Sequence, residues 1–82
     1  MRGFVLYRKS PPEGHREGGY ANAPKEPQLE GVIFSDGTVV VRWLTHFRST
    51  SVWPDFQTFM AVHGHPEYDS EIIWDAWRRG PR

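Results

Sequence analysis

A hairpin signal in the middle of the chain constrains the fold most strongly. Residues 31–44 read GVIFSDGTVVVRWL, so two runs of β-favouring residues flank Ser35, Asp36 and Gly37. Gly37 can adopt a positive φ without steric penalty, and Asp36 suits the adjacent tight turn. Because the apolar residues are densest here, the sequence predicts that a β-hairpin, and not a helix, forms the centre of the core.

Two registers of this hairpin fit the sequence. A two-residue turn at Asp36 and Gly37 pairs Phe34 with Val39, whereas a three-residue turn with Gly37 as a bulge shifts the pairing by one residue. In either register, the second strand presents Val39, Val41 and Trp43 on one side and Val40, Arg42 and Leu44 on the other. Both sides are substantially apolar, which predicts a central strand or a face that meets a partner.

The other elements flank this hairpin. Short apolar runs predict further strands at 4–7, 50–53 and 71–74, and 10–28, with four prolines and three glycines, predicts a long mobile loop. A short helix is expected to begin at Pro54, with Asp55 as its cap, and to end at Gly64. Its apolar face contains Phe56, Phe59, Met60 and His63.

These elements predict a single α+β domain over residues 1–82, with a flexible tail at 78–82. The expected order is strand, long loop, three strands, helix and strand. A small antiparallel sheet of four to five strands then carries one short helix on one face. The chain has no cysteine, which excludes disulfides, and no apolar segment long enough to cross a membrane.

Several segments carry a resemblance to known proteins. They are residues 31–43, 48–50 (RST), 63–65 (HGH) and 72–74 (IIW). Together they resemble a group of small uncharacterised proteins encoded by bacteriophages of actinobacteria and by related prophages, over residues 29–75 and the N-terminal strand. The resemblance implies a small accessory phage protein in the host cytoplasm, and it implies no catalytic residue.

Histidines supply the main candidate for chemistry. His63 and His65, with His46 and the nearby acids, suggest a zinc site in a small metalloenzyme. However, His63 lies on the apolar face of the predicted helix, near its C-terminal end, where a structural role is favoured. The sequence contains no phosphate-binding loop or nucleophile elbow, so we expect no enzymatic activity, metal or cofactor.

Aromatic residues point to a binding function. Four Trp, five Phe and three Tyr exceed what a small core needs, which predicts exposed rings at a contact site. The candidate interaction residues are Arg42, Trp43, Phe47, Arg48, Trp53, Trp74, Trp77 and Arg78. We expect a non-enzymatic protein that binds a host or phage macromolecule, and we favour a protein as this partner. A homodimer is a further alternative. Nucleic-acid binding by Arg and aromatic residues on the sheet is an alternative, disfavoured because ten basic and ten acidic residues cancel.

Overall fold

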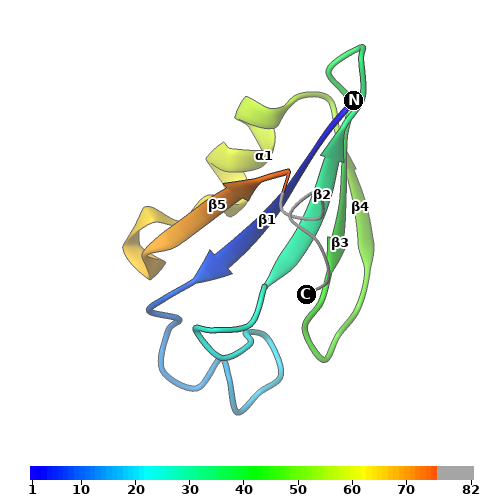
Figure 1. Cartoon of the computed structure of the whole chain (residues 1–82). Helices are drawn as coiled ribbons and strands as arrows, with labels where there is room; N and C mark the ends of the chain where they lie inside the picture. Colours follow the sequence, from blue (N-terminus) through cyan, green and yellow to red (C-terminus); the bar gives the residue numbers. More distant parts are fainter. Residues whose placement is uncertain (76–82) are drawn as a thin grey trace.

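The computed structural model describes residues 1–75, and Figure 1 shows a twisted sheet with one helix on one face. In chain order the elements are β1 (Arg2–Arg8), β2 (Leu29–Ile33), β3 (Val39–Trp43), β4 (Thr50–Trp53), α1 (Phe56–His63), the 3₁₀ turn η1 (Pro66–Tyr68) and β5 (Ser70–Trp74). The five strands are antiparallel and lie in the order β4-β3-β2-β1-β5. The predicted α+β class and order of elements are confirmed.

Strand β1 lies inside the sheet, between β2 and β5. It pairs Phe4 with Gly31 of β2 and with Trp74 of β5. Phe4, Val5 and Leu6 are all fully buried, although they alternate between the two faces of the strand. Because β5 pairs with β1, the last strand of the sheet runs antiparallel beside the first one, as Figure 1 shows.

The hairpin between β2 and β3 has the three-residue turn. Ile33 lies opposite Val39, and the Phe34 N–H donates to Thr38 O over 2.8 Å. Asp36 Oδ1 accepts a hydrogen bond from the Thr38 N–H at 2.9 Å, and Gly37 has φ +95°. The two-residue register is wrong because the Asp36 side chain and the positive φ of Gly37 together fix the longer turn.

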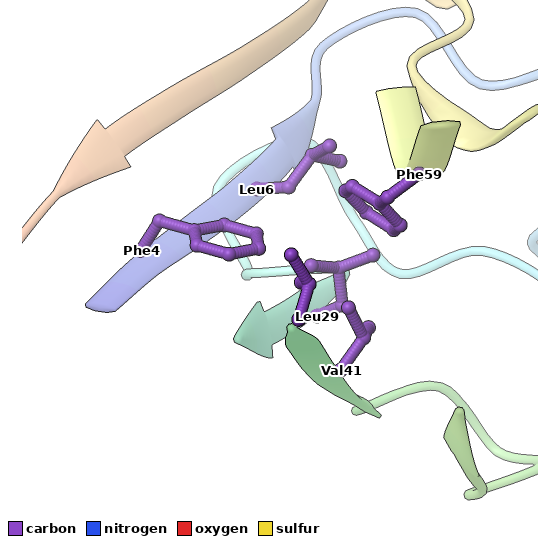
Figure 2. Close-up of a cluster of buried hydrophobic side chains, with 6 residues drawn as sticks. Phe4, Leu6, Leu29, Val41 and Phe59 are labelled. Atoms are coloured by element: carbon purple, nitrogen blue, oxygen red, sulfur yellow. The ribbon is translucent and has the colours of Figure 1, made fainter. Parts of the chain in front are cut away.

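Helix α1 covers one face of the sheet and completes the core. Asp55 Oδ1 accepts the Thr58 N–H at 2.6 Å, which confirms the predicted cap, whereas Pro54 lies before the cap and not in the first turn. Phe59 is fully buried and points from α1 into the side chains of the sheet (Figure 2). The core cluster consists of Phe4, Leu6, Leu29, Val39, Val41 and Phe59.

The segment between β1 and β2 contains no helix or strand, as the sequence predicts, and folds at one end of the sheet (Figure 1). It is nevertheless bonded to that sheet. The Gln28 N–H donates to Leu6 O at 2.7 Å, and Gln28 O accepts the Leu44 N–H at 2.9 Å. The mobility of residues 10–28 stays a prediction. No helix within residues 1–75 has the length and apolar character to cross a membrane.

Candidate functional site

A hollow of about 440 Å³ lies at the end of the sheet where β1 and β3 finish. Its size is in the range of pockets that hold small organic ligands. Its lining includes one cation, three imidazoles and four larger aromatic rings: Arg8; His15, His63 and His65; Tyr20, Trp43, Phe47 and Tyr68. Residues from β1, the 10–28 segment, β3 and the end of α1 therefore meet around one space.

Arg8 is the buried charge of this hollow. It follows Phe4 and Leu6 on the inward side of β1, and only 7 % of its surface is exposed. One guanidinium nitrogen, Nη2, donates to His63 O at 3.1 Å, while the buried Nε makes no hydrogen bond. None of the ion pairs within residues 1–75 involves Arg8. Burial lowers the pKa of Arg8, partly offset by the negative charges of Tyr68 and Glu67 when these groups ionise.

His63 ends α1 and lies beside Arg8. Its ring packs edge-on against Trp43 and Trp53, with ring centroids 4.9 and 5.2 Å apart. Burial lowers the pKa of His63, and the positive charges of Arg8 and His65 lower it further. The neutral imidazole is therefore favoured near pH 7, where it can donate one hydrogen bond and accept another.

His65 lies in a strained turn after α1. Its backbone has φ 39°, in the left-handed region, and its ring stacks on Tyr68 with centroids 4.4 Å apart. His65 Nδ1 is 3.4 Å from Glu67 Oε2, a long contact that orients the imidazole. The pKa of Glu67 is lowered by its own backbone N–H and then by His65. An imidazole oriented by a carboxylate in this way can bind a ligand or exchange a proton with it.

Flat rings form the mouth of the hollow. The rings of Tyr20 and Phe47 lie 5.1 Å apart, and they are 62 % and 54 % exposed. His15 lies between two tyrosines, with its centroid 6.2 Å from both Tyr20 and Tyr68. The site thus combines a buried cation with exposed rings against which a flat ligand can stack.

The residues predicted as interaction anchors are dispersed. Trp43 and Phe47 line the hollow. Trp53 and Trp74 pack against the core instead, and Arg42 lies on the opposite face. Arg42 there donates to Thr50 Oγ1 at 3.1 Å and faces Glu30 across the strands.

Arg48 is exposed between β3 and β4, and Trp77 and Arg78 lie outside the described residues. The predicted histidine cluster is met in part. His63 and His65 share the hollow, whereas His46 is exposed and is not part of its lining. No group of three or more His, Asp or Glu within residues 1–75 is placed to hold a metal ion.

Sequence reasoning missed Arg8, His15 and Tyr20. Arg8 could have been found from the alternation of Phe4, Leu6 and Arg8, because this alternation places a charged residue on the inward side of a strand. His15 and Tyr20 lie in an irregular segment where no periodicity indicates which side chains face the sheet.

Comparison with protein families gives the class of the chain. A family model described as Acb5 phage protein matches residues 28–76, which is more than half of the chain. The chain belongs to this family of phage proteins. This confirms the resemblance to phage proteins, while the link to actinobacterial hosts stays a prediction. No curated protein and no solved structure matches the chain.

The matched region runs from the start of β2 past the end of β5 and contains Trp43, His63 and His65. Arg8, His15 and Tyr20 precede it. The hollow of this phage protein is therefore built partly from residues inside the matched region and partly from the segment before it.

Proposed function

We propose that this phage protein acts by binding a small organic anion that carries a flat ring, in the hollow around Arg8. The supporting observation is a guanidinium that is almost fully buried, has no ion-pair partner within residues 1–75 and keeps an unused Nε donor. Glu67 acts on this charge but forms no ion pair with it, and a buried charge without a close counter-charge destabilises a fold. An anion entering the hollow would neutralise it.

The lining favours a phosphate ester or a carboxylate attached to an aromatic ring. Arginine donates to both kinds of oxyanion through its planar guanidinium. Tyr20 and Phe47, at the mouth, offer faces on which a ring can stack, as nucleobases do in nucleic-acid-binding proteins. Nucleotides are common compounds with this chemistry. A neutral net charge argues against a long polyanion but not against one small anion.

We propose binding without conversion of the ligand, in line with the sequence-based expectation of a non-enzymatic protein. In this role the neutral His63 and the Glu67-oriented His65 supply hydrogen bonds to the ligand. The same two imidazoles are suited to general acid–base chemistry on a phosphate ester, which is the competing function. The test below separates the two.

Isothermal titration calorimetry with AMP, adenosine and inorganic phosphate tests the proposal. We expect AMP to bind more tightly than either part alone, because only AMP uses both Arg8 and the rings. Arg8→Met should weaken AMP binding by about tenfold or more, the value of a charge-assisted hydrogen bond. Arg48→Met, which removes an exposed arginine outside the lining, is the matched control and should bind as the wild type does.

Equal affinity of the wild type and Arg8→Met, or no binding of any of these probes, would contradict the proposal. Chromatography of AMP after incubation with the protein gives the second result. Unchanged AMP supports binding alone, whereas release of adenosine and phosphate would assign acid–base chemistry to the histidines.

A macromolecular partner is the second candidate function, and the sheet face opposite α1 supports it. Val32, Val40 and Val52 are neighbours across three strands on this face, and Phe34 follows Val32 on the same side. Phe34 is 43 % and Val52 67 % exposed. Exposed apolar residues in a cluster are typical of protein contacts, so this face suits a host or phage protein, or a second copy of the chain, in the host cytoplasm.

Size-exclusion chromatography with light scattering tests the homodimer, and affinity capture from phage-infected cells tests the heterologous partner. Val52→Glu should abolish either association, because it places a charge at the most exposed residue of the apolar row. Gln57→Glu, an exposed substitution on α1, is the control. A wild-type protein that is monomeric and captures the same proteins as Val52→Glu would contradict this candidate.

A further inference from the structure

We infer that Asn22 and Gln28 form a hydrogen-bonded clamp that holds Tyr20 in place as one wall of the hollow. The two amides are positioning residues, because both bond the backbone around Tyr20; Asn22 lies outside the lining of the hollow, whereas Gln28 is part of it. The inference rests on the proposed function and adds a specific claim, namely that this clamp determines recognition of the flat ring.

Gln28 is the fixed point of the clamp. It is 2 % exposed, and its backbone is bonded on both sides, to Leu6 O of β1 and to the N–H of Leu44 just after β3. Its side chain uses both ends. Nε2 donates to Tyr20 O at 2.9 Å, and Oε1 accepts the Asn22 N–H at 3.0 Å. A buried amide with every group in use holds one position, because moving it would leave polar atoms unsatisfied.

Asn22 ties the segment to the rest of the fold. Its Nδ2 donates to Pro27 O and to Leu44 O, both at 2.9 Å. One side chain thereby joins two parts of the 10–28 segment to the chain that leaves β3. On the other side of Tyr20, the N–H groups of Tyr20 and Ala21 both donate to His15 O. The clamp therefore sets the positions of both Tyr20 and His15.

The Tyr20 ring depends on this backbone for its position. Its contacts with other rings within residues 1–75 are with His15 and Phe47, and it is 62 % exposed, so packing alone holds it weakly. A wall that is ordered before the ligand arrives reduces the entropy lost on binding. The Gly- and Pro-rich composition of the segment provides no such order, since those residues favour irregular structure. The side-chain amides provide it.

Amide hydrogen exchange, measured by NMR on the full chain without ligand, gives the first test. Asn22→Ala should increase the exchange rates of the Tyr20 and Ala21 amides by about tenfold or more, because local opening then breaks fewer hydrogen bonds. The amides of β2 and β3 should exchange as in the wild type. Gln28→Met is the second variant, and Glu26→Ala, an exposed substitution in the same segment, is the control.

Calorimetry with AMP and inorganic phosphate gives the second test. In Asn22→Ala, the affinity for AMP should fall towards that for phosphate, while the affinity for phosphate, which depends on Arg8, stays unchanged. A general loss of structure would weaken both ligands equally. Tyr20→Ala should reproduce the selective loss of AMP binding.

Unchanged exchange of Tyr20 and Ala21 in both clamp variants would overturn the inference. So would faster exchange with the preference for AMP over phosphate retained, since Tyr20 would then not be the wall that recognises the ring. A wild-type protein that binds neither probe removes the proposed function, and the role in recognition with it. The exchange data are independent of any ligand and distinguish that failure from failure of the clamp.

Discussion

The ring of Phe4 on β1 lies directly against the backbone of Gly31 on β2. The two residues are paired across the strands, and a Cβ on Gly31 would overlap the far end of the Phe4 ring. From this position the ring contacts Phe56 of α1 and Trp74 of β5, with centroids 5.2 and 5.6 Å away. The missing side chain in one strand therefore allows one ring to join three elements.

Gly31→Ala is accordingly expected to destabilise the protein by roughly 1–3 kcal/mol, the cost of overpacking a core. Replacing a strand glycine by alanine is otherwise favourable, because it reduces the entropy of the unfolded chain. Urea unfolding of Gly31→Ala, Phe4→Leu and the double variant measures the effect. The smaller leucine should relieve part of the overlap, so strictly additive losses would contradict the proposed contact.

Gly37→Val should destabilise the β2–β3 turn through backbone strain. Gly37 has φ +95°, and a Cβ there would meet no atom within 4 Å, so the cost comes from conformation and not from a clash. We expect a loss of about 1–3 kcal/mol for valine and a smaller loss for Gly37→Asn, because asparagine tolerates left-handed backbone better. Equal losses in thermal unfolding would show that the conformation of this residue is unimportant.

Local patterns predicted most of the fold. The Asp36-Gly37 turn, the Asp55 cap and the spacing of Phe56, Phe59 and His63 each identified an element that the structure contains. The inner position of β1 was not predictable in this way, because it depends on pairing with β5, more than sixty residues along the chain. The sequence left two hairpin registers open. The register depends on the hydrogen bond from the Thr38 N–H to the Asp36 side chain, and residue types alone do not show whether that bond forms.

The candidate site was less predictable than the fold. The sequence indicated Trp43, and it paired His63 with His65, since both follow from their local elements. The hollow also needs Arg8 and Tyr20, which reach it through strand alternation and through buried amide bonds in an irregular segment. Hydrogen bonds between distant residues, such as that from Asn22 to Leu44 O, produce no periodic pattern of residue types from which they could be predicted.

Phe59→Ala should cost roughly 3–5 kcal/mol, because Phe59 is fully buried between α1 and the sheet. Losses of this size approach the whole stability of a small domain. Phe59→Leu should cost less, since most of the volume is retained. Val62→Ala, on the half-exposed side of α1, is the control and should change the melting temperature little. An unmoved melting temperature for Phe59→Ala would contradict the helix face described here.

Arg8→Met should separate stability from ligand binding. It removes a buried charge that has no ion-pair partner within residues 1–75, together with its hydrogen bond to His63 O and its contact with the Tyr68 ring. Because methionine keeps much of the packing volume and the buried charge is relieved, we expect unchanged stability or a gain of up to about 2 kcal/mol. The same change should weaken AMP binding by about tenfold or more. Urea unfolding in the absence of ligand, alongside calorimetry, measures both. A large loss of stability would instead assign Arg8 a structural role through its hydrogen bond to His63 O.

The stability of the protein should fall as the pH decreases through the ordinary pKa of histidine. Burial, with the positive charges of Arg8 and His65 facing it, holds the pKa of His63 below its ordinary value of 6.5. Between the lowered pKa of His63 in the folded protein and its ordinary pKa in the unfolded chain, the unfolded chain binds more protons than the folded one. The free energy of unfolding therefore rises with pH in this range and levels off above about 6.5. Protonation is disfavoured in the fold, and acid shifts the equilibrium to the unfolded state.

Unfolding of the wild type and of His63→Gln from about pH 5 to about pH 8 tests this prediction. The variant should lose the part of the slope just below pH 6.5, because glutamine does not titrate. The carboxyls of Asp36 and Asp55 do not interfere, since backbone hydrogen bonds from Thr38 and Thr58 lower their pKa values from an already acidic starting point. Their stabilising effect is present above the ordinary carboxyl pKa and is lost only in stronger acid. Identical slopes for the two proteins would show that His63 is as easily protonated in the fold as in the unfolded chain.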